Sequence, residues 1–146
     1  MTSIINALGK AAAFLGGARQ RDLDNLLAQQ IFGWEPTQDY VYPSSGAMIS
    51  SYRARAWRRP KSRDLIAEEH IPQYSSGYDC WLVVEEMRRT HQKGVRIADI
   101  QHEGQHQWCA AFCAYGSEPA PEDYSVADDL PLAICHAAAR AQNITI

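Results

Sequence analysis

The stretch Tyr74–Arg89, YSSGYDCWLVVEEMRR, decides the fold because it holds the clearest helical pattern in the chain. On a helical wheel its apolar side chains share one arc, with Trp81 at the edge: Cys80, Val83, Val84 and Met87. This spacing predicts an amphipathic helix that lies on a hydrophobic core. We expect Ser75 or Ser76 to cap the helix, because a hydroxyl can accept a hydrogen bond from an unpaired amide of the first turn. Glu85 and Arg89, four residues apart, are expected to pair.

Two further helices flank this stretch in the sequence. The leucine-rich segment Asp22–Phe32 has helical periodicity, and Gly33 follows where a left-handed residue commonly ends a helix. Near the end of the chain, Leu130–Ala141 shows a second apolar stripe. Asp128 or Asp129 is expected to cap it, and Pro131 suits its first turn.

Alternating apolar and polar residues predict strands between the helices. Ala47–Trp57 alternates over its whole length. Val95–Gln101 and His106–Tyr115 alternate on either side of a glycine-containing turn, which predicts a β-hairpin. We expect the segments 58–72 and 116–129 to be mainly loops, because they combine prolines with charged residues.

The pattern of elements predicts an α+β domain in which a small antiparallel sheet is sandwiched between helices, in α-β-α layers, with an added N-terminal helix. A length of 146 residues suits one domain. We place that domain at residues 18–146 and an amphipathic helical appendage at residues 1–17. The helix of residues 3–15 either docks on the domain or joins a partner or a second copy in a homo-oligomer.

Composition places the chain among ordinary globular proteins, with 46% hydrophobic and 21% charged residues. No apolar run approaches the roughly 20 residues of a membrane span, and the first residues lack the positive start of a secretory signal. We therefore expect a cytoplasmic protein without membrane contact. Its cysteines are not spaced like a disulfide framework and are expected to be reduced: Cys80, Cys109, Cys113 and Cys135.

Three parts of the sequence together resemble the phage ABA sandwich domain. They are LDNLLAQQIFGW at Leu23–Trp34, PQYSSGYDCWLVVEEMR at Pro72–Arg88, and a W-x-A-x-F strand at Trp108–Phe112 followed by ADDLPLAICHAAARA at Ala127–Ala141. The resemblance implies a small phage-encoded accessory protein with an α-β-α layered core that acts in the host cell. It implies no chemistry, because the shared residues are of core and capping types.

The strongest local anomaly is a run of cations. Six basic residues fall within Arg53–Arg63, and no acidic residue lies between Asp39 and Asp64. The formal net charge of the chain is −3, so the residues outside this run carry a net charge of −9. Together with two aromatic residues, the six basic residues form the predicted partner-binding set: Tyr52, Arg53, Arg55, Trp57, Arg58, Arg59, Lys61 and Arg63. Trp57 is expected to anchor the partner, since aromatic residues among arginines are typical of binding hot spots.

Several occupants suit this basic stretch. A nucleic-acid backbone, a small phosphorylated ligand and an acidic protein surface all fit clustered guanidinium groups. The alternative is that the basic stretch has no binding function and is a solvated loop, whose cations pair with the acidic residues of the segment 116–129.

Catalytic and metal sites have weaker support in the sequence. His102, His106, Cys109 and Cys113, with Cys135 or His136, are ligand types that bind zinc, but Cys109 and Cys113 would lie about 13 Å apart on a strand. Neighbouring helical side chains such as Cys135 and His136 point about 100° apart and cannot form a dyad.

No phosphate loop, G-x-S-x-G or H-E-x-x-H motif is present in the sequence. We therefore expect a protein that acts by binding, without catalysis, cofactor or metal. The expected partner is a host protein or protein–nucleic acid complex, as for an anti-CRISPR inhibitor. A sponge for a small nucleotide signal and a nucleic-acid-binding phage protein are the alternatives.

Overall fold

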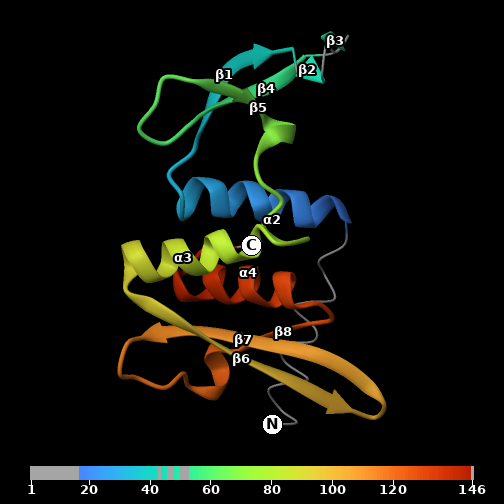
Figure 1. Ribbon diagram of the computed structural model, residues 1–146, viewed down its shortest axis with the longest axis vertical. Coiled ribbons are helices and arrows are strands. Elements are labelled where there is room, and N and C mark those ends of the chain that lie inside the picture. Colours follow the sequence, from blue (N-terminus) through green and yellow to red (C-terminus); the bar gives the residue numbers. More distant parts are fainter. Residues whose placement is uncertain (1–16, 43, 46–47, 50–52, 146) are drawn as a thin grey trace.

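Two three-stranded antiparallel sheets lie at opposite ends of the molecule, with helices between them (Figure 1). The computed structural model describes residues 17–42, 44–45, 48–49 and 53–145. In this part of the chain the α-helices are α2 (Gly17–Gln30), α3 (Cys80–His91) and α4 (Leu130–Ala141). Across the same residues, no helix has both the length and the apolar character needed to cross a membrane.

The lower sheet in Figure 1 contains the predicted hairpin. Its strands are β6 (Lys93–His102), β7 (Gln105–Ala114) and β8 (Ser125–Ala127), in the order β6-β7-β8. A two-residue turn at Glu103 and Gly104, with φ values of 52° and 77°, connects β6 to β7, as the twist of a tight hairpin requires. The prediction of a loop over 116–129 is wrong in part. This segment forms the 3₁₀ turn η2 (Pro121–Asp123) and then β8, which pairs with β7.

Helix α3 confirms the predicted buried arc, since Cys80, Val83 and Met87 are fully buried. Its predicted cap is wrong. The helix begins after Asp79, and the backbone N–H of Ser75 instead donates to Oδ1 of Asp24 in α2 at 2.9 Å.

The surface ion pairs of α3 are also spaced differently from the prediction. Arg88 contacts Glu85 at 2.5 Å and Arg89 contacts Glu86 at 2.9 Å, each three residues apart rather than four. The Arg88–Glu85 pair is exposed, so it contributes little to stability, whereas the Glu86 side chain of the second pair is only 16% exposed.

Helix α4 is the central helix of the hydrophobic core. Asp129 caps it as predicted, because its Oδ1 accepts a hydrogen bond from Leu132 N at 2.9 Å. The helix is buried on more sides than its stripe predicted, since Leu132, Ala133, Cys135 and Ala139 are buried as well as Ile134, Ala137 and Ala138. The reason is its position, with β7 and β8 on one side and α3 and α2 on the others (Figure 1).

Helix α2 leads into the upper sheet. It begins at Gly17, five residues before the predicted start at Asp22, and Gly33 ends it as predicted: Gly33 has φ of 80°, and Trp34 N donates to Ala28 O at 2.9 Å. The upper sheet has the order β1-β4-β5 and comprises β1 (Glu35–Val41), β4 (Ala54–Arg58) and β5 (Leu65–Ala67). The 3₁₀ turn η1 (Glu68–His70) follows β5.

The predicted strand Ala47–Trp57 and the loop 58–72 are therefore only partly correct. The described residues of the first segment divide between β4 and the short strand β3 (Met48–Ile49), which pairs with β2 (Ser44–Ser45). Within 58–72, β5 and η1 are regular elements that lack a sequence pattern long enough to predict them.

These differences change the layers but not the fold class. The α+β class is confirmed. Instead of one sheet covered by helices on both sides, the helices lie between two three-stranded sheets, because β4 of the predicted strand Ala47–Trp57 pairs with β1 and β5, which were not predicted (Figure 1). The proposed appendage, residues 1–17 with its partner helix 3–15, lies outside the described residues except for Gly17, so that interpretation stays a prediction.

Candidate functional site: a cationic pocket at the β4–β5 hairpin

The connection between β4 and β5 forms a tight, self-bonded loop. Arg58 pairs with Leu65 in the hairpin register, and within the loop Arg59 N donates to Asp64 O at 3.1 Å and Ser62 N donates to Arg59 O at 3.3 Å. The hydroxyl of Ser62 accepts a further hydrogen bond from Asp64 N at 3.0 Å. These bonds fix the backbone that presents the basic side chains.

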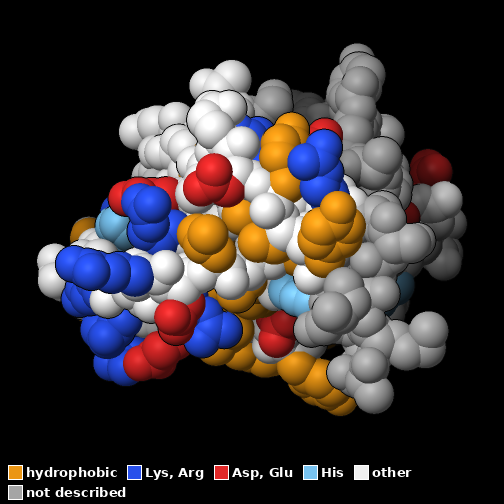
Figure 2. Space-filling view, turned by 90° about the horizontal axis from the view of Figure 1, so that it is seen from above, with side chains coloured by type: hydrophobic (Ala, Val, Ile, Leu, Met, Phe, Trp, Pro, Cys, Tyr) orange, Lys and Arg blue, Asp and Glu red, His pale blue; other side chains and the backbone are white. Residues whose placement is uncertain are grey.

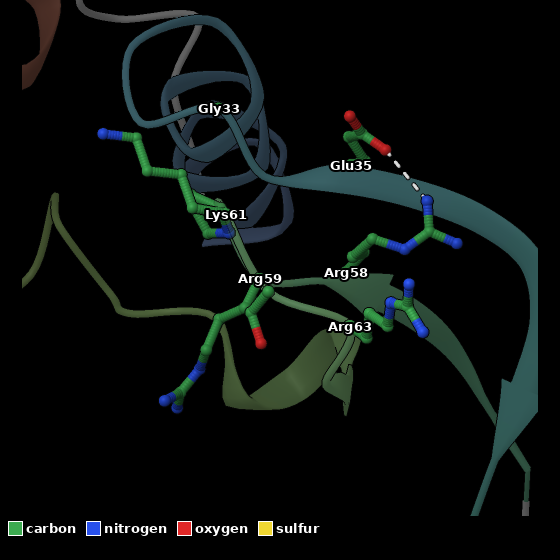
Figure 3. A pocket seen from close by; sticks show the side chains of 8 residues that line it. Gly33, Glu35, Arg58, Arg59, Lys61 and Arg63 are labelled. Atoms are coloured by element: carbon green, nitrogen blue, oxygen red, sulfur yellow. Dashed lines mark hydrogen bonds and ion pairs between the residues drawn. The ribbon is translucent and has the colours of Figure 1, made fainter.

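A pocket of about 440 Å³ lies between this loop and the link from α2 to β1 (Figure 3). Its lining includes four of the six predicted cations, which we call the cationic pocket residues: Arg58, Arg59, Lys61 and Arg63. Gly33, Glu35, Pro60 and Ser62 complete the lining. Seen from above, Lys and Arg side chains gather along one side of this end of the molecule (Figure 2).

The pocket is strongly positive, because Glu35 is the only acid in its lining. Glu35 pairs with Arg58 at 3.2 Å, a contact drawn as a dashed line in Figure 3. The guanidinium of Arg59 lies 5.9 Å from the centre of the Trp34 ring, close enough for a cation–π contact. Within the part of the chain described, Arg59, Lys61 and Arg63 make no ion pair, so four cations and one carboxylate leave a net charge of +3.

Lys61 has an unfavourable backbone conformation for its residue type. Its φ of 55° lies in the left-handed region, which costs a side chain other than glycine or asparagine about 1 kcal/mol. Glycine or asparagine would suit this turn better. A lysine here therefore adds positive charge to the pocket at the expense of stability.

A polar network attaches the hairpin to α2. Oε1 of Glu68 accepts hydrogen bonds from Trp57 Nε1 at 3.1 Å and from Asn25 Nδ2 at 3.3 Å. Arg21 donates to the carbonyl oxygens of Ile71, at 2.9 Å, and of Glu68. The upper sheet is thus joined to α2 by directional bonds as well as by apolar packing, so the pocket sits on a rigid base.

The network overturns the predicted role of Trp57. Its side chain is only 4% exposed and belongs to the same apolar cluster as Leu27, Trp34 and Ile71. A residue this deeply buried cannot serve as an exposed anchor for a partner. Trp57 instead holds β4 against the core.

The remaining predicted site residues do not line the pocket. Arg53 lies 5.4 Å from the ring centre of Tyr40, and Arg55 Nε donates to Thr37 O at 3.0 Å, so both contact β1. Tyr52 lies outside the described residues. The hairpin therefore divides the basic run into a pocket group and a group along the β1 edge.

The acidic segment 116–129 does not neutralise the hairpin in the described residues. Its carboxylates accept hydrogen bonds from other groups: Asp129 caps α4, Asp123 accepts from Ala120 N at 2.8 Å, and Asp128 accepts from Gln107 Nε2 at 3.1 Å. The alternative of a basic loop paired with this segment is therefore not supported.

The cysteines and histidines are dispersed. Within the described ranges, no group of three or more His, Cys, Asp or Glu side chains is placed to hold a metal ion, although the side chain of His102 is not described. Cys109 is buried, Cys113 Sγ donates to Ser117 O at 3.3 Å, and the ring of His106 contacts Trp108 edge-on.

The chemical state of the thiols follows from their burial. Desolvation raises the pKa of the Cys80 and Cys109 thiols and raises the pKa of Cys135 well above its usual range. These groups are protonated at neutral pH and are therefore poor nucleophiles.

Sequence reasoning missed Glu35 and Gly33 as parts of the site. Gly33 had been assigned only a helix-ending role, and Glu35 had no signal beyond following it. Both approach the hairpin because β1 pairs with β4, with Glu35 opposite Arg58 in the register. The only sequence signal was that Glu35 is the last acid but one before the basic run.

Comparison with known proteins identifies the chain at the family level. No curated protein and no solved structure matches it. The family model described as the phage ABA sandwich domain matches residues 25–139, which is well over half of the chain and includes α3, most of α4 and both three-stranded sheets. The chain belongs to the phage ABA sandwich domain family.

Proposed function

We propose that this phage accessory protein acts by binding, without catalysis, and that its cationic pocket captures a negatively charged component of a host defence complex. The family match supports the phage setting. A role in counter-defence, like that of an anti-CRISPR inhibitor, goes beyond the family match and is what we propose. We take the β4–β5 hairpin as the binding surface, because a protein that blocks a host complex needs one strongly complementary face.

One observation carries the proposal: Arg59, Lys61 and Arg63 surround a single pocket and have no ion-pair partner in the described residues. Unpaired cations gathered on one rigid loop speed up the encounter with an acidic partner and disfavour basic ones. The strained backbone of Lys61 supports a binding role, because strain that persists at a surface loop often accompanies function.

The absence of catalysis is part of the proposal. It is supported by the raised pKa values of three of the four thiols and by the lowered pKa of His136, about 4, which burial causes. A thiol that stays protonated and a histidine that stays neutral are badly placed to act as nucleophile and general acid.

The test is capture from the bacterial host with the tagged, full-length protein as bait. We expect a host protein or protein–nucleic acid complex to co-purify with the parent protein. Lys61→Glu should reduce capture, because it reverses a charge in the pocket. Arg96→Glu, a matched reversal of an exposed cation on β6 at the other end of the molecule, should not reduce it.

The outcomes that decide the proposal are clear. It fails if nothing is captured reproducibly, or if the two reversals reduce capture equally. Turnover of a metabolite by the purified protein would refute the non-catalytic role. Melting curves of both variants ensure that a lost interaction is not lost folding.

A sponge for a small nucleotide signal is the second candidate. It is favoured by one observation, the concave shape of the pocket, whose volume of about 440 Å³ falls in the range of small-ligand sites. The expected lining of a sponge also includes tyrosine or tryptophan, and the lining described here has neither. A binding experiment with purified components separates the two candidates.

A further inference from the structure

We infer that the cationic pocket binds phosphate groups, supplied either by a free nucleotide or by the backbone of a nucleic-acid strand, and that it does not recognise the base. This inference rests on the proposed function, because it names the chemistry of the partner at the same site.

The charge of the pocket favours phosphate. Four basic side chains line one pocket, and among the described residues only Arg58 is paired with a carboxylate. A ligand that carries several negative charges close together therefore suits this lining. Adjacent phosphates do so, and their oxygens match the forked donors of arginine. A single glutamate or aspartate of a protein partner would leave most of the positive charge unpaired.

The shape of the pocket points to the same ligand. The site is an open hollow of about 440 Å³, large enough for a nucleotide or a short length of single strand to lie against its basic side chains. The hydrogen bonds within the loop fix its backbone before binding, which lowers the entropy cost of ordering the loop around the ligand.

The lining lacks the groups that read bases. Single-stranded nucleic acids are usually held by bases stacked on aromatic rings. The nearest tryptophans do not provide this surface, because Trp34 is 9% exposed with Arg59 over its ring, and Trp57 is 4% exposed. The donors on the lining are guanidinium, ammonium and hydroxyl groups, which contact phosphate irrespective of sequence. Affinity should therefore depend on the phosphates and not on the base.

The test measures direct binding by fluorescence anisotropy with the purified full-length protein. The probes are fluorescein-labelled oligothymidylate and oligoadenylate of equal length. The competitors are ATP, pyrophosphate and an oligoglutamate peptide with the same net charge as the labelled strand. We expect both oligonucleotides to bind equally. Affinity should fall with salt at a slope of about −0.7 per phosphate contacted, which is about −2 for the three unpaired cations.

Two variants and one control locate the site. Lys61→Asn removes a charge and places a residue that tolerates φ of 55° in the turn, so its melting temperature should not fall. Arg63→Gln removes a second charge. Each should weaken binding about tenfold, because a charge-assisted hydrogen bond is lost. Arg96→Gln on β6 should leave the affinity unchanged.

Competition separates the two sources of phosphate. If ATP or pyrophosphate displaces the labelled strand as efficiently as unlabelled strand does, the pocket is a nucleotide site. If only longer strands compete, it is a backbone site. Equal displacement by oligoglutamate overturns the inference, because charge alone would then explain binding. A strong preference for one base, or no binding of any phosphate probe tighter than about 1 mM, also overturns it.

Failure here and failure of the proposed function are distinguishable. If the phosphate probes fail while host capture still depends on Lys61, the binding role stands and only the ligand class is wrong. If the phosphate probes bind while no host component is captured, the counter-defence role falls and the ligand class stands.

Discussion

Trp57 and Glu68 form a hydrogen bond that joins β4 to η1: the indole Nε1 donates to the carboxylate Oε1 at 3.1 Å. The two residues lie eleven positions apart, on β4 and η1, and the same carboxylate oxygen accepts from Asn25 of α2. A side chain that the sequence places among arginines is thus a structural residue. Its burial separates Trp57, which stabilises the fold, from the exposed cations beside it in the sequence.

The first prediction tests this separation. Trp57→Phe keeps most of the apolar contact but removes the donor, and should lower the free energy of unfolding by about 1 kcal/mol. Trp57→Ala should lower it by about 3–5 kcal/mol, because it also leaves a cavity. Urea denaturation measures both. A Trp57→Phe variant of unchanged stability that no longer binds its partner would restore the anchor interpretation.

The second prediction concerns Asp24, a buried carboxyl that accepts the backbone N–H of Ser75. Burial raises its pKa above the model-peptide value of 3.8, so stability falls as pH rises from 3.8 through the raised pKa, and the ionised group opposes folding at pH 7. Asp24→Asn keeps the acceptor without the charge, and its free energy of unfolding at pH 7 should equal or exceed that of the parent.

Asp24→Ala is the matched control for that substitution. It leaves the buried Ser75 N–H unpaired and should cost about 1–3 kcal/mol. Equal losses in the two variants would show that the charge itself stabilises the fold. Thermal denaturation at pH 7 distinguishes the outcomes.

The third prediction concerns acid sensitivity. Burial, and secondarily the charge of Arg140, lowers the pKa of His136 to about 4 from the ordinary value of 6.5. The unfolded chain binds this proton more readily between those two values, so stability is lost as pH falls from 6.5 towards 4. On the order of 1–2 kcal/mol should be lost between pH 7 and pH 5.

The variant His136→Leu should remove most of that loss. The control is His106→Gln, which changes an exposed histidine on β7. Denaturation curves at the two pH values give the comparison. If the stability of His136→Leu depended on pH as the parent's does, groups other than His136 would cause the loss of stability at low pH.

The fourth prediction compares two glycines. Gly33 has φ of 80° at the end of α2, and Gly77 is not in the left-handed region, while a side chain at either position would meet no atom within 4 Å. Gly33→Ala should therefore cost about 1 kcal/mol from backbone conformation alone. Gly77→Ala should stay within about 0.5 kcal/mol of the parent. If both changes are equally mild, the ending of α2 is more adaptable than its geometry indicates.

The parts of the fold predicted from the sequence are those with long, regular patterns. Helices α3 and α4 and the β6–β7 hairpin have apolar periodicities of ten residues or more, with a cap at Asp129 and a turn at Gly104. Strands β5 and β8 have three residues each, too few to establish any period, and they form because a neighbouring strand offers unpaired backbone groups. Strand β1 was missed because its sequence, EPTQDYV, is polar and its register against β4 is irregular.

The site was predicted in part for related reasons. The run of cations is visible in the sequence, and four of its members do line one pocket. The burial of Trp57 was not predictable, because it depends on an acceptor from η1 and on packing against α2. The cap of α3 failed for the same reason: Asp24, 51 residues away, binds the Ser75 amide.

The separation of the hairpin tip from the core has a consequence for how such a protein can diversify. Residues 59–63 are exposed or half-buried and belong to no apolar cluster, while β4 behind them is fixed by Trp57 and Ala56. Substitutions at the tip should therefore leave the stability of the scaffold nearly unchanged. If the hairpin is the binding surface, as we propose, a phage lineage can alter its specificity through a handful of codons in this loop, and the helical core does not need to change with it.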